Sequence, residues 1–253
     1  MPRFLSKLLP ALLALFCLRI RAADPAPGTV SYPSGGEAVS GFLASPGEAG
    51  KHPALILIHE WWGLNDWVRE KARSFAARGY VALAVDLYRG GVATDPDTAH
   101  QLMRGLPEDR AIRDLKAAFA YLTSRPDVDG ARIASVGWCM GGGYSLALAQ
   151  AEPRLAAAVI YYGRLITDEG EIAKIRPKLL GNFGEEDKGI SPASVRAFET
   201  AAKKAGLSVD FKIYSGAGHG FASSSDPKVF RPEAAKDADT RTDTFLEREL
   251  KGR

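Results

Sequence analysis

Cysteine is scarce in this sequence, which has only Cys17 and Cys139 among its 253 residues. Cys17 lies in an N-terminal segment that we expect to be removed, so the mature chain would keep Cys139 alone. A lone cysteine excludes an internal disulfide, and it excludes a redox pair in which a second thiol resolves the first. The thiol of Cys139 is therefore either a buried, inert side chain or a group with a chemical function.

A strong excess of charge of one sign is also absent. The chain has 33 Lys and Arg against 30 Asp and Glu. Residues 1–22 contain four of the basic residues and no acidic one, so without them 29 basic residues face 30 acidic ones, a net charge of −1. Such a chain carries no electrostatic signal for a polyanion, and we expect no nucleic-acid partner. Its 46% hydrophobic content is ordinary for a globular protein with a substantial core.

One long apolar run stands out at residues 8–18, and it is too short to cross a bilayer comfortably. Basic residues precede the run at Arg3 and Lys7, and the small residues of "AADPAPG" follow it. This layout is typical of a secretory signal peptide that is cut after Ala22.

The leader decides where the protein acts. We expect residues 1–22 to be a signal peptide and residues 23–253 to form a single domain. The protein would then be exported, to the periplasm or outside the cell, with no stable membrane association after the leader is removed. The alternative is an uncleaved membrane anchor, because Arg19 and Arg21 lie unusually close to the cut.

The rest of the chain alternates apolar runs, typical of buried strands, with amphipathic segments, typical of helices. Strands are expected within 52–60, 80–88, 131–138, 154–163, 176–187 and 207–221, with a short edge hairpin at 28–46. Helices are expected at 65–80, 97–124 with an interruption near 105–107, 143–151, 191–206 and 237–251. This alternation predicts an α/β fold, with a mostly parallel central sheet and helices on both faces.

Side chains able to do chemistry follow several of these strands, at the edge where parallel strands end. Cys139, Asp187 and His219 occupy such positions, in that chain order. The pentapeptide Gly137–Gly141, "GWCMG", has the spacing of the G-x-S-x-G nucleophile elbow, with sulfur in place of oxygen. Its glycines permit a sharp turn into a helix, whose N-terminus favours a thiolate. The Met140 N–H can donate to an oxyanion at the same place.

Each member of this set also has a purely structural interpretation. Cys139 could fill a tight corner, and His219 could be a hydrogen-bonded loop histidine. Asp187 could cap the helix that follows it, in which case Glu185 or Glu186 would take its catalytic place. The combination of a G-x-C-x-G turn with an aspartate and then a histidine at later strand ends favours catalysis.

Six short motifs give the sequence a resemblance to the dienelactone hydrolase family over about residues 28–250: "HEWWG", "DLY", "GWCMGG", "YYG", "GEED" and "GHGF". The resemblance implies an α/β-hydrolase fold. It also implies that Cys139 is the nucleophile and His219 the general base and then the general acid. Asp187 would orient His219.

The resemblance extends to further site residues. Glu60 would be an extra carboxylate that assists deprotonation of the thiol, although a salt bridge at the end of a strand would also explain it. The backbone N–H groups of Trp61 and Met140 would form the oxyanion hole. Substrate-binding residues would be Trp62, Tyr88, Arg89, Trp138 and Tyr162.

The resemblance implies an ester or lactone of small size as the partner, and neither a metal nor an organic cofactor. The "HE" at 59–60 is not a zinc motif, because Gly63 stands where its second histidine would be. We expect a monomer.

The implied reaction is acyl transfer in two steps through a thioester on Cys139. Three alternatives stay open. The protein could be a general carboxylesterase or thioesterase on neutral acyl substrates, a redox or peroxide-reactive thiol protein, or a catalytically silent scaffold.

The sequence departs from the family at the positions that would bind a substrate carboxylate. Members that take dienelactone hold its carboxylate with two arginines. Here Arg89 follows Tyr88 one position early, and Ser223 stands where the second arginine would be. A serine hydroxyl lacks the charge and the two-pronged geometry of a guanidinium, and only Arg231 or Arg164 could compensate. We therefore expect a preference for neutral or weakly polar esters and lactones.

Protein purified from its native host should begin near Ala23. An intact-mass measurement checks this, and a mass that includes residues 1–22 would contradict the signal peptide.

Overall fold

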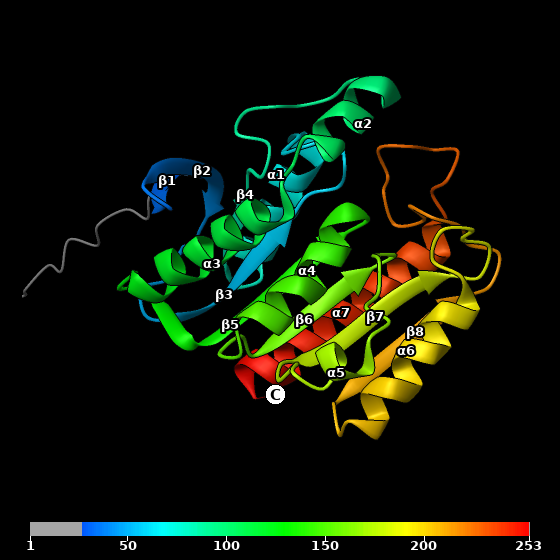
Figure 1. Ribbon diagram of the computed structural model, residues 1–253. Helices are drawn as coiled ribbons and strands as arrows, with labels where there is room; N and C mark the ends of the chain where they lie inside the picture. Colours follow the sequence, from blue (N-terminus) through cyan, green and yellow to red (C-terminus); the bar gives the residue numbers. More distant parts are fainter. Residues whose placement is uncertain (1–26, 253) are drawn as a thin grey trace, which may run out of the picture.

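The computed structural model describes residues 27–252, and the expected signal peptide lies outside them. Its centre is an eight-stranded sheet with the order β1-β2-β4-β3-β5-β6-β7-β8 (Figure 1). β2 pairs antiparallel with β1 and β4, and every pairing from β4 to β8 is parallel. The strands are β1 (Gly28–Ser34), β2 (Glu37–Ala44), β3 (His52–Ile58), β4 (Val81–Val85), β5 (Val128–Trp138), β6 (Ala157–Tyr161), β7 (Lys178–Gly184) and β8 (Val209–Tyr214).

The helices of the described chain lie between and after these strands. They are α1 (Asp66–Ala77), α2 (Pro96–Arg104), α3 (Glu108–Ser124), α4 (Met140–Ala151), α5 (Glu169–Ile172), α6 (Pro192–Lys204) and α7 (Pro232–Lys251). α6 begins after the N-cap Ser191 with a proline in its first turn. Within residues 27–252, no helix has the length and apolarity that a membrane span requires.

The predicted start of the last helix is wrong. The pattern placed it at residue 237, but α7 begins at Pro232 and runs for 20 residues. Proline fits there because the first turn of a helix has no use for its missing N–H. The added turn also buries Ala235 against the sheet, next to Ala238.

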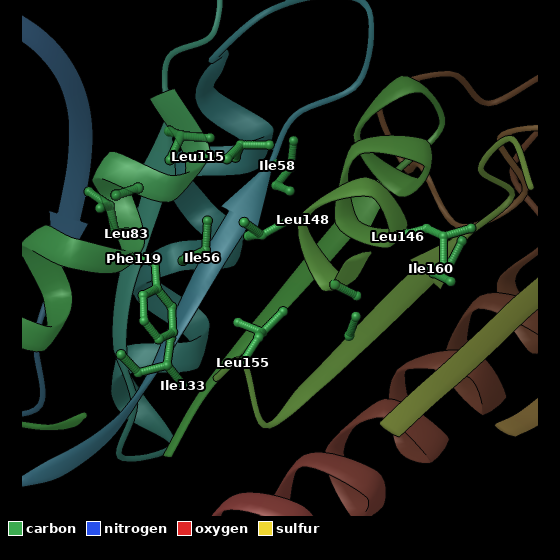
Figure 2. Packing of buried hydrophobic residues seen from close by; sticks show 14 of the residues in the cluster. Ile56, Ile58, Leu83, Leu115, Phe119, Ile133, Leu146, Leu148, Leu155 and Ile160 are labelled. Carbon is green, nitrogen blue, oxygen red and sulfur yellow. The ribbon is translucent and has the colours of Figure 1, made fainter. Parts of the chain in front are cut away.

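Helices cover both faces of the sheet, and each face has its own apolar core. On one face, α3 and α4 pack over Ile56 and Ile58 of β3 while α6 covers β7 and β8, and Figure 2 shows part of this cluster from close by. On the other face, α1 packs over Leu55 and Leu57 of the same strand while α7 covers β5, β6 and β7. Alternate residues of β3 therefore enter opposite cores, which explains its unbroken apolar sequence. The expected mostly parallel α/β fold is confirmed.

Two glycines let α4 begin in direct contact with the strands beside it. A side chain on Gly141 would overlap the carbonyl oxygens of Ile58 and His59, and a side chain on Gly142 would overlap that of Tyr161. The strands concerned, β3 and β6, flank β5 on its two sides. The N-terminus of α4 is thus fixed at the carboxyl end of the central strands.

Gly141→Ala should destabilise the protein by about 1–3 kcal/mol, because the new methyl group pushes α4 away from the end of β3. Thermal unfolding checks this, with an expected fall in Tm of roughly 2–12 °C. Gly143→Ala is the matched control, since outside α4 its methyl group would meet its nearest neighbour, the backbone nitrogen of Arg164, at an ordinary contact distance of 3.5 Å. That variant should be as stable as the parent or slightly more stable. Equal stability of the two variants would contradict the proposed contact.

Candidate active site

The turn from β5 into α4 holds Cys139 in a strained conformation. Its φ of 55° and ψ of −118° lie in a region that non-glycine residues rarely adopt. The backbone N–H of Cys139 donates to the carbonyl oxygen of Tyr161 at 3.0 Å, which ties the turn to the end of β6. Because α4 starts at Met140, the thiol stands at a helix N-terminus, where negative charge is favoured.

The structure brings Cys139, His219 and Asp187 into one hydrogen-bonded chain. His219 Nε2 lies 3.0 Å from Cys139 Sγ, and His219 Nδ1 lies 2.7 Å from Asp187 Oδ2. The three residues follow β5, β8 and β7, so residues 32 to 80 positions apart meet at one edge of the sheet. This is the geometry of a nucleophile, a base and the group that orients the base.

Hydrogen bonding decides the charge of His219. Partial burial opposes a charged imidazole, but the contacts with Asp187 and Cys139 outweigh it and raise the pKa of His219 to about 10. A proton on the ring therefore faces the sulfur at neutral pH, and such a contact stabilises a thiolate. The side chain of His219 is 44% exposed, which leaves the ring open to a substrate and to water.

Asp187 both orients His219 and shapes its own loop. Burial raises the pKa of a carboxyl, but the bond to His219 and two backbone donors overcome it and hold the pKa of Asp187 below its usual range. Those donors are the N–H groups of Gly189 and Ile190, at 2.8 and 2.9 Å from Oδ1. The two alternative carboxylates, Glu185 and Glu186, are exposed.

Glu60 lies at the end of β3, almost fully buried at 5% exposure. Its Oε1 accepts a hydrogen bond from the hydroxyl of Tyr162 at 3.3 Å, and its Oε2 accepts one from Ser223 at 2.9 Å. The ring of Tyr162 in turn packs edge-on against His219, with ring centroids 5.2 Å apart. Tyr162 therefore connects Glu60 with His219.

His59 is a buried residue whose role the sequence interpretation missed. Its Nε2 accepts the N–H of Leu87, so the proton sits on Nδ1 and is donated to the carbonyl oxygen of Glu60 at 2.6 Å. Burial lowers the pKa of His59 and keeps it neutral. The ring thereby joins the loops that follow β3 and β4. The fully apolar strand before "HE" was the signal that this histidine would be buried.

The two N–H groups expected to form an oxyanion hole lie on neighbouring elements. Met140 is the first residue of α4, and its N–H has no carbonyl within the helix to which it can donate. Trp61 comes two residues after His59, whose carbonyl oxygen lies against Gly141 at the start of α4. Among the hydrogen bonds of residues 27–252, none uses the N–H of Trp61. Both donors are therefore available for a substrate oxygen.

Aromatic side chains surround this edge of the sheet. The rings of Trp61 and Trp62 lie 4.8 Å apart, and Trp61 also meets His100 of α2 edge-on at 4.8 Å. The hydroxyl of Tyr88 lies 3.2 Å from Sδ of Met140, the residue that follows Cys139.

Two residues expected to bind substrate are engaged elsewhere. Arg89 directs its guanidinium to Glu37 at 2.8 Å and Asp114 at 3.2 Å, toward β2 and α3. Trp138 is 1% exposed, and its ring lies in the core between Trp67 and Tyr161. Neither side chain is presented to the thiol, and the substrate-binding interpretation of both is corrected here.

A cleft of about 520 Å³ opens beside His219 and Asp187. Its rim carries Lys188, Lys228 and Arg231. The guanidinium of Arg231 is occupied by backbone carbonyl oxygens, including that of Lys228 at 3.1 Å. Within the described part of the chain, His, Cys, Asp and Glu do not gather into any group of three or more suited to a metal ion.

Comparison with known proteins gives a consistent picture. A model of the dienelactone hydrolase family matches residues 39–250. A protein of Methylorubrum extorquens named "Putative carboxymethylenebutenolidase" is 30% identical over 224 residues, which cover 83% of this chain and 77% of that protein. "Protein usf" of Aquifex pyrophilus is 31% identical, over 87% of this chain and 98% of its own length.

A solved structure agrees. The crystal structure titled "Putative Dienelactone Hydrolase" from Klebsiella pneumoniae matches with a TM-score of 0.80 and 26% identity, over 87% of this chain and 97% of its own. The family model spans nearly all of the sheet and helices described above. The chain belongs to the dienelactone hydrolase family, whose members are ester- and lactone-cleaving enzymes.

Proposed function

We propose that the protein hydrolyses carboxylic esters or lactones through a Cys139–His219–Asp187 triad and a thioester acyl-enzyme. The observation that carries the proposal is the continuous contact from Sγ through the imidazole to the carboxylate, at 3.0 and 2.7 Å. The strained φ of Cys139 is a second support, because such strain concentrates at functional sites.

Acylation begins with attack of the Cys139 sulfur on the substrate carbonyl carbon. The carbonyl oxygen becomes an oxyanion, which the N–H groups of Trp61 and Met140 stabilise. The tetrahedral species then collapses to a thioester. His219 Nε2 gives its proton to the departing alkoxide, which leaves as an alcohol or, from a lactone, as the hydroxyl end of the same molecule.

Deacylation uses the same residues in reverse. His219, now neutral, removes a proton from a water molecule, whose oxygen attacks the thioester carbonyl. The oxyanion forms again and collapses, which releases the carboxylic acid and returns the sulfur to its contact with His219. Asp187 holds the imidazole in the tautomer with its proton on Nδ1 throughout, since both oxygens of Asp187 are occupied.

The substrate side of the proposal is a preference for esters and lactones without a free carboxylate. Arg89 is paired with two carboxylates, and the hydroxyl of Ser223 donates a hydrogen bond to Glu60. Neither offers a free positive charge to a substrate. One relative, from Bradyrhizobium, is named "Probable 2-oxo-3-(5-oxofuran-2-ylidene)propanoate lactonase", and its named substrate is an acid. We propose that this chain differs from that relative in the charge it accepts.

We also propose that the enzyme acts after export and as a monomer. The chemistry above needs one chain only, because all three triad residues come from it.

Cys139→Ala should abolish hydrolysis of p-nitrophenyl acetate, because no other side chain supplies the nucleophile. His219→Ala should lose about 10³-fold or more, since members of a triad act as a unit. Steady-state kinetics checks both, and thermal unfolding confirms that the variants are folded. Near-parental turnover by Cys139→Ala would show that the thiol is structural, and thiol titration after peroxide exposure would then test the redox alternative.

A matched pair of substrates, a carboxylate-bearing lactone and its methyl ester, tests the specificity. The methyl ester should have the higher kcat/KM, by roughly ten- to a hundredfold, because a carboxylate that loses its hydration without gaining a partner costs about 1–3 kcal/mol. A higher value for the free acid would overturn the preference. In that case Lys228→Ala would reveal whether the cleft beside His219 binds the carboxylate.

A further inference from the structure

The carboxyl group of Glu60 is held by neutral hydroxyl groups alone. Ser223 donates to Oε2 at 2.9 Å and Tyr162 to Oε1 at 3.3 Å. Both partners are buried, at 3% and 0% exposure. None of the ion pairs formed by residues 27–252 includes Glu60. Its carboxyl lies deep at the end of a central strand, and its partner Ser223 is 163 positions away in the sequence.

The charged groups that face Glu60 act on it from a distance. His219 lies beyond Tyr162, on the loop after β8, and its positive charge lowers the proton affinity of the carboxyl. Lys71 of α1 acts in the same direction, but its ammonium group is paired with Asp239 of α7 at 3.1 Å. The two residues that contact the carboxyl, Ser223 and Tyr162, stay neutral at working pH. Burial raises the pKa of Tyr162 far above its usual value.

The hydroxyl of Ser223 is itself oriented. Ser225 Oγ lies 2.8 Å from Ser223 Oγ and is exposed. The loop between them is fixed on both sides, because Ser223 N–H donates to Gly220 and Trp67 Nε1 donates to Ser224 Oγ at 3.2 Å. When Ser223 gives its proton to Glu60, Ser225 is the donor to Ser223.

We propose that Ser223 is a positioning residue that holds Glu60 in the same place whether its carboxyl is ionised or protonated, and so lets it change charge during the reaction. When Glu60 is a carboxylate, the Ser223 hydroxyl donates to it and the Ser225 hydroxyl donates to Ser223. Toward a carboxylic acid, Glu60 donates to Ser223 and Ser223 donates to Ser225, so each proton has a place. A cation at this position would hold only the ionised form. The inference rests on the proposed function, because it concerns Glu60 beside the triad.

Burial is the largest influence on this carboxyl and raises the pKa of Glu60, whereas the Ser223 hydrogen bond and the charge on His219 oppose it. Loss of the Ser223 hydroxyl removes one opposing contact, so Glu60 would take up its proton at higher pH. Because His219 loses its charge when it protonates the leaving group, the proton affinity of Glu60 also rises at that moment. Glu60 and His219 thus influence each other through Tyr162.

The test is a set of pH profiles of kcat/KM. Ser223→Ala should move the acid limb to higher pH by about one unit, the effect expected from the loss of one hydrogen bond to a charged group. Ser223→Thr should restore the parental profile because it keeps the hydroxyl. Ser215→Ala is the matched control on the segment after β8, because its hydroxyl donates to the exposed Glu185 and not to Glu60, and its profile should not move. In a Glu60→Gln background, Ser223→Ala should have no further effect on the limb.

The outcomes are distinct. If Ser223→Ala and Ser215→Ala have the same acid limb while Cys139→Ala is inactive, the inference is wrong and the proposed function stands. If Ser223→Thr behaves like Ser223→Ala, a role in loop packing replaces the positioning role. If Cys139→Ala is active, the proposed function itself has failed.

A second readout does not depend on activity. Because burial raises the pKa of folded Glu60, it binds more protons than the unfolded chain above the ordinary glutamate pKa of 4.5, so the stability of the parent should fall as pH rises through that range. Glu60→Gln has no such group and should become more stable relative to the parent as pH increases. Denaturant unfolding at several pH values measures the difference. If the difference in unfolding free energy between Glu60→Gln and the parent is the same at every pH, the inference that Glu60 changes its charge beside Ser223 is overturned.

Discussion

The structure depends on one close contact, between the first turn of α4 and the ends of β3 and β6. The contact exists because Gly141 and Gly142 have no side chains, and it forces the backbone at Cys139 into a positive φ. The strain is maintained by two apolar cores that cannot rearrange locally. The sulfur is thereby lifted above the edge of the sheet, where the loops after β7 and β8 can reach it.

The remaining parts of the site are spread over loops, and aromatic rings connect them. Tyr162 has the central position: its ring lies against His219 and Phe221, and its hydroxyl reaches Glu60. A phenylalanine there would keep the wall beside the imidazole and lose the bond to the carboxyl. The ring contact with His219 and the hydrogen bond to Glu60 can therefore be altered separately, even though Tyr162 makes both.

Much of this could be predicted from the sequence because the relevant patterns are local. The G-x-C-x-G spacing reports a turn that only glycine permits, and an aspartate and a histidine after later strands must come to the same edge of a parallel sheet. Trp138 shows where such reasoning fails, because the assignment ignored that successive side chains of a strand point to opposite faces of the sheet. It directly precedes Cys139, so its side chain leaves the strand on the other side, in the core beneath α1.

Other features depend on contacts that no local pattern carries. Arg89 was assigned by its distance from a motif, yet its partners Glu37 and Asp114 come from two other elements. The bond between Glu60 and Ser223 joins positions 163 residues apart. The start of α7 was placed too late because its first residues, "PEAAK", include no large apolar side chain, and the buried cluster that Ala235 joins is not visible in the sequence.

The hydrogen bonds of His59 also set a limit on the conditions in which the site can exist. Its Nε2 faces the N–H of Leu87, so a second proton on the ring would oppose donor to donor inside the protein. Since burial lowers the pKa of His59 below its ordinary value of 6.5, this residue adds stability above that pH and withdraws it as the medium becomes more acidic. A second proton on His59 would therefore weaken the join between the loops after β3 and β4, and the first of these loops carries Trp61.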